Sequence, residues 1–257
     1  MDLIVRPRVA ASVVGILAAT SLTFFLPDLD LSNGVADAFV RLTDTGSRIG
    51  MAYMVMILMA VVLSRPNLAN RRRLKEAGAI LLIAITVGFV VSTVNEYAIK
   101  SALAVPRPNI VAITTSGALG PAYPDADALY AVGNKDDRRE VLGELLPLVD
   151  APSLSTLVRS HWVYETGYSF PSGHSTGVAA LATIVAAIGV SWLEGWRRVI
   201  TVYLAPAWAV LVAHSRVLLG VHRPVDVIVG ALFGFAIGLA VIAIYNRLVP
   251  QRTAEAA

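Results

Sequence analysis

Cysteine is absent from this chain, and charged residues are scarce. The 257 residues include no Cys, which excludes disulfide bonds and thiolate metal sites. Charged residues make up 15% of the chain, whereas a soluble domain carries about 25%. The formal net charge is only +3, so the composition gives no indication of a nucleic acid partner. The scarcity of charge argues against an ordinary soluble domain and favours an integral membrane protein.

Long apolar runs take the place of the missing charges. Hydrophobic residues account for 56% of the chain, and the mean hydropathy is +0.67. A helix needs about 20 mostly apolar residues to cross a bilayer core. The runs predict six membrane-spanning helices near Val9–Leu26, Ile49–Ser64, Ala77–Glu96, Ser175–Leu193, Val199–Ala213 and Val225–Tyr245. We expect the first run to be retained rather than cleaved as a signal peptide, because Ala36-Asp37-Ala38 is a poor and distant cleavage site.

Basic residues are concentrated in alternate connections between these runs. They precede the first run, separate the second from the third and the fourth from the fifth, and follow the sixth. These residues are Arg6, Arg8, Arg65, Arg71, Arg72, Arg73, Lys75, Arg197, Arg198, Arg247 and Arg252. Since cytoplasmic loops are enriched in Lys and Arg, the pattern predicts cytoplasmic termini and places the opposite connections outside the cytoplasm.

One long polar insertion interrupts the apolar runs within a single predicted membrane domain, residues 1–257. Residues 106–170 separate the third run from the fourth, and Pro, Gly and Asp punctuate them. A loop this long is usually functional or carries structure of its own. We therefore expect an extracytoplasmic cap, with a disordered loop as the alternative.

Two short helices are predicted within this insertion. Helical spacing predicts one helix at Arg138–Leu148, with Val141, Leu145 and Leu148 on one apolar stripe. A second short helix is predicted at Ser155–Trp162. The expected architecture is therefore an all-α bundle of six membrane helices with a helical cap on one side.

Lys100 and Arg107 form the first of three charged segments at the ends of apolar runs. Lys and Arg meet phosphate oxygens with charge-assisted hydrogen bonds. Pro106 and Pro108 are expected to break the helix, which lets Arg107 turn back toward Lys100. The alternative is that both cations only reach from a helix end into the headgroup region of the bilayer.

The second segment is Pro171-Ser172-Gly173-His174, directly before the fourth apolar run. Proline favours the first turn of a helix, and glycine lets a ligand approach the backbone closely. Free N–H groups at a helix N-terminus bind anions, so Ser172 and Gly173 are candidate phosphate ligands through their backbone. The hydroxyl of Ser172 can add a further bond. The alternative is an ordinary capped helix start.

The third segment contains Arg216, His222 and Asp226, between the fifth and sixth runs. Gly220 permits a tight turn and Pro224 can start the next helix, which leaves His222 just outside it. A carboxylate on one imidazole nitrogen fixes the tautomer and leaves the other nitrogen free as a nucleophile. Asp226 in the first helical turn suits the helix dipole and can take this role. The alternative is a structural Asp–His hydrogen bond at a helix cap.

The same residue types also allow a metal site as a competing interpretation. His174, His222 and Asp226 are of the kinds that bind zinc. The three cations of the charged segments would oppose a divalent metal and favour an anionic ligand. We therefore expect a phosphate site that uses neither a metal nor another cofactor.

Together the three segments resemble the type 2 phosphatidic acid phosphatase superfamily, whose pattern is KxxxxxxRP, then PSGH, then SRxxxxxHxxxD. The resemblance implies that His222 attacks phosphorus to form a phosphohistidine and that Asp226 orients it. It implies that His174 protonates the leaving group and then activates water. The remaining motif residues would hold the phosphoryl oxygens: Lys100, Arg107, Ser172, Gly173 and Arg216. It further implies a multi-pass protein of the bacterial inner membrane, with an extracytoplasmic site and lipid phosphates as substrates.

The end of the insertion adds a narrower resemblance. Arg159–Trp162 and Glu165–Gly167, leading into the second segment, resemble the bacterial phosphatidylglycerophosphatase B branch. This branch implies phosphatidylglycerophosphate as the substrate. Polyprenyl (undecaprenyl) pyrophosphate and phosphatidate remain alternatives, as does phosphotransfer to an acceptor other than water.

A lipid or anion transporter is the alternative outside the enzymes. A transporter places its charged site near the bilayer midplane, whereas these charges fall at helix ends. Three residues stay outside the motif assignments. His161 is interpreted as structural, His214 as facing another helix, and Glu165 as either closing a salt bridge or recognising an amine.

Overall fold

The computed structural model describes residues 7–65, 69–148 and 153–249, and within these ranges the regular structure is entirely helical. The α-helices are α1 (Pro7–Ser21), α2 (Gly34–Asp44), α3 (Arg48–Leu63), α4 (Asn70–Val94), α5 (Lys100–Leu103), α6 (Pro108–Thr115), α7 (Ala126–Tyr130), α8 (Lys135–Leu145), α9 (Thr156–Tyr164), α10 (Gly173–Trp192), α11 (Gly195–Val199), α12 (Ala205–Leu218) and α13 (Pro224–Leu248). Short 3-10 or π turns accompany them: η1 (Leu22–Phe25), η2 (Asn95–Ile99), η3 (Leu146–Leu148) and η4 (Ile200–Leu204). The expected all-α fold class is confirmed.

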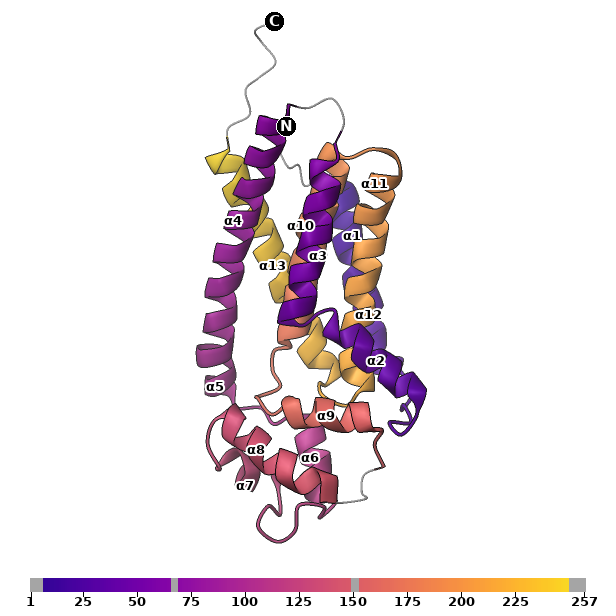
Figure 1. The fold of residues 1–257 in the computed structure, drawn as a ribbon, viewed down its shortest axis with the longest axis vertical. Coiled ribbons are helices and arrows are strands. Elements are labelled where there is room, and N and C mark those ends of the chain that lie inside the picture. The colour runs from indigo at the N-terminus through magenta and orange to yellow at the C-terminus, as the bar shows by residue number, and fades with distance from the viewer. Residues whose placement is uncertain (1–6, 66–68, 149–152, 250–257) are drawn as a thin grey trace, which may run out of the picture.

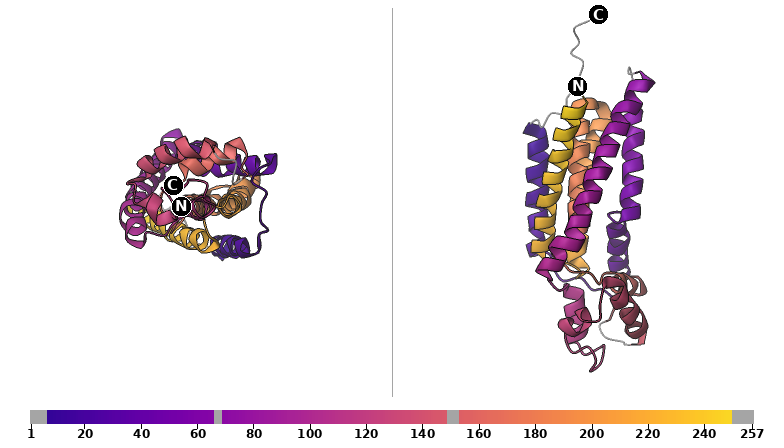
Figure 2. Two further views of the ribbon diagram at one scale, coloured as in Figure 1. Left: turned by 90° about the horizontal axis from the view of Figure 1, so that it is seen from below. Right: turned by 90° about the vertical axis from the view of Figure 1, so that its left-hand side faces the viewer.

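The long helices form one elongated bundle, and short helices cover one of its ends. Helices α1, α3, α4, α10, α12 and α13 run along the long axis, whereas α6, α7, α8 and α9 gather beyond one end (Figure 1). Figure 2 shows the same division from the side. We call α6–α9 the cap. Helix α2 lies at the same end and packs against α9 and α12.

In the described part of the chain, four helical stretches are long and apolar enough to cross a membrane. They are Asn70–Leu103, Gly173–Trp192, Gly195–Leu218 and Pro224–Leu248. Helices α2 and α3, bent by 62° relative to each other, add a fifth candidate if they are counted as one span. The first of the six expected spans corresponds to α1 and η1, where the apolar stretch Val13–Phe25 is shorter.

Two span boundaries differ from those predicted from hydropathy. Helix α4 begins at Asn70 rather than near Ala77, so Arg71–Arg73 lie in its first turn instead of in a loop. The span predicted at Val199–Ala213 is the middle of the longer stretch Gly195–Leu218. Arg and Lys are good helix formers, so a helix continues through polar ends that a hydropathy window leaves out.

Helix α10 lies at the centre of the bundle, and small residues bring α13 close to it. Its neighbours include α1, α3, α12 and α13. A Cβ added at Gly230 of α13 would lie 2.5 Å from the carbonyl oxygen of Ser172, and Gly234 and Gly238 approach α10 in the same way. Small residues at helical spacing permit such approach in membrane bundles. The contact places the first turns of α10 and α13 side by side.

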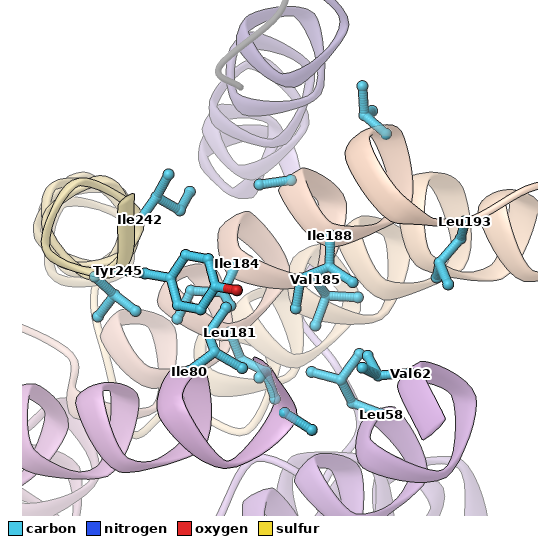
Figure 3. Close-up of a cluster of buried hydrophobic side chains, with 14 of the residues drawn as sticks. Leu58, Val62, Ile80, Leu181, Ile184, Val185, Ile188, Leu193, Ile242 and Tyr245 are labelled. Atoms are coloured by element: carbon cyan, nitrogen blue, oxygen red, sulfur yellow. The ribbon is translucent and has the colours of Figure 1, made fainter. Parts of the chain in front are cut away.

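An apolar cluster at the end of the bundle away from the cap holds α3, α4, α10 and α13 together. Figure 3 shows side chains from these helices facing one another, among them Leu58, Val62, Ile80, Ile184, Ile188 and Tyr245. All of these are buried. Close packing of this kind stabilises helix association within lipid, where no water remains to be excluded.

The cap packs around an apolar cluster that it shares with α2 and with the connection between α12 and α13. Leu129, Leu142, Leu146, Val158 and Trp162 are among its buried residues. The helix predicted at Ser155–Trp162 is α9, with Ser155 as its N-cap, and the helix predicted at Arg138–Leu148 is α8 followed by η3. Helices α6 and α7 were not predicted.

The buried stripe of α8 differs from the predicted one. Leu142 and Leu146 are fully buried, whereas Leu148 is 80% exposed. Val141 and Leu145 lie at the edge of the core and are half-buried. Both sets have helical spacing, and the 3-10 turn after Leu145 changes the angular step per residue, which carries Leu148 to the surface.

Candidate active site

The predicted site residues converge at the end of the bundle that the cap covers. They lie on α5, at the start of α6, around the start of α10, near the end of α12 and around the start of α13. Six of them are at most 5% exposed: Lys100, Arg107, Ser172, Arg216, His222 and Asp226. The three charged segments of the sequence therefore form one buried cluster.

Lys100 reaches this cluster through an irregularity in its helix. The π turn Asn95–Ile99 directly precedes it. A π turn adds one residue to a helical turn and so rotates the side chains that follow it. Lys100 Nζ lies 3.2 Å from one carboxylate oxygen of Glu96, and the other oxygen lies 3.1 Å from Lys135 Nζ in the cap. Glu96 thus joins the cap to the helix that carries Lys100.

Arg107 lies where the chain enters the cap, and Pro108 takes the first position of α6. Its Nε donates to the carbonyl oxygen of Gly167 at 2.9 Å. Its Nη1 lies 3.3 Å from the carbonyl oxygen of Val221 and 3.2 Å from His222 Nε2. One guanidinium group therefore connects both ends of the cap with the segment that precedes α13.

His222 lies in the short connection before α13, and Asp226 lies in the first turn of that helix. The turn uses Gly220, whose φ of 68° is in the left-handed region that glycine favours. Asp226 Oδ2 accepts from the backbone N–H of Arg223 at 2.8 Å and lies 3.4 Å from His222 Nδ1. The hydroxyl of Ser169 donates to the same oxygen. Asp226 therefore caps the helix and contacts the imidazole at once.

The contacts of His222 determine which ring nitrogen carries the proton. Arginine cannot accept a hydrogen bond, so Arg107 donates to Nε2, which must hold a lone pair. The proton is then on Nδ1, facing Asp226. Burial, Arg107 and Arg216 hold the pKa of His222 well below its usual range. The imidazole is therefore neutral, with the tautomer that a nucleophilic Nε2 requires.

A single carboxylate, that of Glu165, bridges the two buried arginines. Its Oε2 lies 2.9 Å from Arg107 Nη2, and its Oε1 lies 2.5 Å from Arg216 Nη2. Burial opposes ionisation of Glu165, but Arg107 and Arg216 hold the pKa of this carboxyl well below its ordinary value. Of the two interpretations of Glu165 from the sequence, the salt bridge is the one observed.

His161 lies closer to the site than its structural interpretation implies. Its Nε2 is 3.2 Å from Arg216 Nη1 and accepts a hydrogen bond from it. Burial and the neighbouring Arg216 lower the pKa of His161 to about 4, so the ring is neutral. His214 faces α1, as expected, with Nε2 2.9 Å from the carbonyl oxygen of Ala19.

The start of α10 contributes Gly173 and His174, which line a cavity, whereas Ser172 is fully buried. The backbone N–H of Ser172 donates to the carbonyl oxygen of Asp226 at 3.0 Å. The expectation that this N–H is free for a phosphate is therefore not met, because close packing of α10 on α13 engages it. The Ser172 hydroxyl accepts from the backbone N–H of Ser175 at 3.4 Å. Its role toward a ligand stays a prediction.

A cavity of about 1440 Å³ connects the cluster with the interior of the bundle. Its polar end is lined by Lys100, Arg107, Glu165, His174 and His222. Its other walls come largely from apolar side chains of α3, α4, α10 and α13. Arg216 does not line it directly, although its partners Glu165 and His161 do. The cavity can therefore take a ligand with one anionic and one apolar part.

Cations dominate the polar end of this cavity. Among the residues that the structure describes, no group of three or more His, Cys, Asp or Glu side chains is arranged to hold a metal ion. Lys100 and Arg107 line this end and can donate to an anion with several oxygens, and Arg216 lies behind Glu165.

Several supporting residues of the site were missed from the sequence, Glu96, Ser169 and Tyr130 among them. Ser169 supports Asp226 from 57 positions away. The Tyr130 hydroxyl accepts from the backbone N–H of Arg107 at 3.1 Å and donates to the carbonyl oxygen of Gly167 at 3.1 Å. Ser169 lies only two residues before Pro171 of the second segment, but a serine hydroxyl there does not by itself indicate Asp226 as its partner. The need of buried polar groups for partners is the signal that could have indicated Ser169 and Tyr130.

Similarity to known proteins agrees with this arrangement. The chain is 33% identical to phosphatidylglycerophosphatase B of Escherichia coli (strain K12) over 159 residues, which cover 62% of the chain and 56% of the relative. It is 34% identical to the protein of the same name from Haemophilus influenzae over 119 residues, or 44% and 48% of the two proteins. A shorter stretch of 69 residues is 42% identical to undecaprenyl-diphosphatase of Sulfolobus acidocaldarius and covers 27% of the chain and 30% of that protein.

The alignment with the E. coli relative covers a little more than half the length of that protein. The profile of the PAP2 superfamily matches residues 76–250, which is well over half of the chain and includes every predicted site residue. The resemblance seen in the three motifs is thereby confirmed, and the chain belongs to the PAP2 superfamily.

Proposed function

We propose that the protein is an integral membrane phosphatase that removes the phosphate group from a lipid phosphate ester. The proposal rests above all on His222, whose Nε2 lone pair faces Arg107 at the polar end of a cavity with largely apolar walls. A lipid phosphate needs both halves of such a cavity, one for its phosphate and one for its chains. The phosphatase names of the relatives support the same reaction.

The reaction would begin with attack of His222 Nε2 on phosphorus. The new N–P bond forms as the P–O bond to the lipid breaks, and His174 gives a proton to the leaving alkoxide. Water then attacks the phosphohistidine while His174 takes up a proton, which releases orthophosphate and restores His222. Asp226 stabilises the positive charge that develops on the His222 ring.

The cations would take the part that a metal plays in other phosphatases. Lys100, Arg107 and Arg216 would neutralise the charge of the transferred phosphoryl group. Gly173 and the hydroxyl of Ser172, at the start of α10, would add hydrogen bonds to its oxygens. The chemistry proposed for this site therefore requires no metal or other cofactor.

Phosphatidylglycerophosphate is the substrate that we propose first, because it is the one implied by the names of the relatives with the longest alignments. Undecaprenyl diphosphate is the second candidate, since a shorter alignment links the chain to a protein named for it. Transfer of the phosphoryl group to an acceptor other than water would use the same first step.

Phosphate release from a panel of purified lipid phosphates in detergent tests the reaction and the substrate together. The panel would contain phosphatidylglycerophosphate, phosphatidate and undecaprenyl diphosphate, assayed with and without a chelator. We expect turnover that the chelator leaves unchanged and that the His222→Ala protein lacks. No release from any of these lipids by the wild-type protein would refute the proposal.

We also propose a six-span topology in a bacterial inner membrane, with α1 as the first span and the cap outside the cytoplasm. The basic residues at the opposite end of the bundle support this orientation. The chain contains no Cys, so single cysteines can be labelled without background. Ala122→Cys, exposed in the cap segment, should react with an impermeant thiol reagent, and Asn70→Cys, exposed at the other end, should not. The reverse pattern would invert the topology.

A further inference from the structure

Each of the three cations proposed to bind phosphate already has a carboxylate partner. Lys100 pairs with Glu96, while Arg107 and Arg216 share Glu165. Glu165 lines the cavity, and Arg216, which is fully buried, does not. A phosphate entering the cavity therefore meets Glu165 before it can meet Arg216.

The pairing of Arg216 with Glu165 leaves one donor of the arginine unused. Glu165 Oε1 binds Nη2 of Arg216, and the buried Nε of Arg216 has no hydrogen-bond partner in the described structure. Nε and Nη2 donate in parallel from one edge of the guanidinium group, which matches two oxygens of one phosphate. A phosphate in place of Glu165 would satisfy both donors.

Glu165 also lies next to the reacting nitrogen. Its Oε2 binds Nη2 of Arg107, while Nη1 of the same guanidinium group is 3.2 Å from His222 Nε2. Oxygens of a phosphoryl group in contact with Nε2 would therefore compete for the donors that Glu165 holds. Two anions this close repel strongly in a buried site, so the carboxylate and a phosphate dianion cannot both stay on the two arginines.

We propose that Glu165 is an internal competing anion. Its carboxylate occupies the phosphoryl-oxygen positions between Arg107 and Arg216, leaves when substrate binds, and returns to expel orthophosphate. The proposal builds on the proposed function by assigning a residue that sets the affinity of the site for its substrate and its product. Without substrate, Glu165 compensates two buried cations that would otherwise be left uncompensated. With substrate, its displacement frees Arg107 and Arg216 for the phosphate, and Arg107 can withdraw from the lone pair of His222.

The exchange requires movement of a side chain only. The backbone of Glu165 is held at the end of α9, where its carbonyl oxygen accepts from the Asn109 amide at 3.3 Å. Its carboxylate faces the cavity, which provides space for rotation about the side-chain bonds.

Binding of orthophosphate and vanadate to purified protein tests the proposal without reference to turnover. Isothermal titration of Glu165→Gln should give a dissociation constant at least about tenfold lower than that of the wild type, because a competing charge has been removed. The matched control is Glu76→Gln, which removes a carboxylate that also bridges two arginines, at the other end of the bundle. Glu76→Gln should leave the phosphate affinity unchanged.

Kinetics of the Glu165→Gln protein give a second and independent measurement. Because the product would then leave slowly, both KM and kcat should fall and orthophosphate should inhibit more strongly. A purely structural salt bridge predicts the opposite, namely weaker phosphate binding in a folded variant. Unchanged or weaker binding of phosphate by folded Glu165→Gln would overturn the proposal.

Two further measurements cover the case in which Glu165→Gln does not fold. Glu165→Asp keeps the charge but shortens the side chain, so it should bind phosphate more tightly than the wild type by a smaller factor. A structure of the wild-type protein with vanadate should show the Glu165 carboxylate away from both arginines. Vanadate bound beside His222 with both salt bridges intact would refute the exchange. Tight phosphate binding by Glu165→Gln, together with no turnover of any lipid by the wild-type protein, would support the exchange while refuting the proposed function.

Discussion

Both ends of the helix bundle hold a buried glutamate between two arginines, but the surroundings of the two groups differ. Away from the cap, Glu76 lies 2.9 Å from Arg65 Nη2 and 2.9 Å from Arg72 Nε. Beneath the cap, Glu165 lies 2.9 Å from Arg107 and 2.5 Å from Arg216. The two groups have the same ionic chemistry. That chemistry alone therefore cannot make one group a binding site and the other not.

The difference lies in what else the arginines contact. Arg65 donates from Nε to the carbonyl oxygen of Val62 at 2.9 Å and stacks over the Trp192 ring at 4.7 Å. The side chain of its counterpart Arg72 is 53% exposed. The Glu76 group therefore joins the end of α3 to the start of α4 and lies outside the cavity wall.

Beneath the cap, both arginines are buried and each contacts an imidazole. Arg107 lies 3.2 Å from His222, and Arg216 lies 3.2 Å from His161. The bridging carboxylate itself faces a cavity. An ion pair becomes useful for binding when another anion can reach it and replace one partner, and only the group beneath the cap meets this condition.

The largest effect is expected from removal of the proposed nucleophile. His222→Ala should lower lipid phosphate turnover by about 10⁴-fold or more, since no other described imidazole has an Asp partner on Nδ1. Rapid quenching with radiolabelled substrate should give base-stable label on the wild type only. Glu76→Gln, in the matching group at the other end, should keep turnover within a few-fold of the wild type.

Equal labelling of the His222→Ala and wild-type proteins would contradict the assignment of the nucleophile. Comparable losses of turnover in His222→Ala and Glu76→Gln would remove the distinction between the two ends. Circular dichroism of both variants would show whether each remains folded.

The next effect is expected at His174, the proposed general acid. His174→Ala should lose about 10²–10⁴-fold with lipid substrates, because their alkoxide leaving groups need a proton. An aryl phosphate with a good leaving group should restore part of this loss, whereas it should not restore His222→Ala. The comparison of kcat/KM for the two substrates in both variants measures this. Restoration of His222→Ala alone would reverse the two assignments.

The sequence indicated which residues gather beneath the cap because local motifs carry them, while their roles toward a substrate stay predictions. The spacing of His222 and Asp226 across a helix start brings these two side chains together, with Nδ1 and Oδ2 3.4 Å apart. The apolar runs likewise predicted the long helices, since length and hydropathy are properties of each segment alone. The exact first and last residues of each helix depend on polar side chains, which a hydropathy average does not assess.

Contacts between segments that are far apart in the chain could not be predicted from the sequence. Glu165 could be expected near the site, but its position between Arg107 and Arg216 depends on how the cap lies on the bundle. Ser169 and Tyr130 support site residues through single hydrogen bonds across the fold. The engagement of the Ser172 N–H by Asp226 follows from helix packing, which no motif encodes.

Stability should respond more than activity when the group away from the cap is broken. Arg65→Met keeps an apolar stem beside Trp192 but removes one partner of the buried Glu76. Loss of one partner of a buried pair costs about 3–5 kcal/mol, and the lower end is expected because Arg72 remains. Thermal unfolding in detergent should show the loss, while kcat/KM stays near that of the wild type. A large fall in kcat/KM of the folded variant would show that the two ends are coupled.

Acid should destabilise the end beneath the cap through His161. Its pKa of about 4 in the folded protein lies below the ordinary 6.5, so the unfolded chain binds more protons between these values. The stability from neutral His161 is therefore fully present above pH 6.5 and is lost as the pH falls toward 4. His161→Gln, which can still accept from Arg216, should weaken the fall in unfolding temperature over this range. An unchanged slope would show that His161 does not titrate in this way.

The smallest effect is expected at Arg72, the exposed member of the group away from the cap. Its side chain is 53% exposed, and surface ion pairs contribute about 0–1 kcal/mol. Arg72→Ala should therefore change the unfolding temperature far less than Arg65→Met, although both residues lie 2.9 Å from Glu76. Its small effect should shrink further at high salt, because exposed pairs are screened. If Arg72→Ala lowered the unfolding temperature as much as Arg65→Met, burial would not determine the strength of these ion pairs. The contrast between the two ends would then depend on the histidines and the cavity alone.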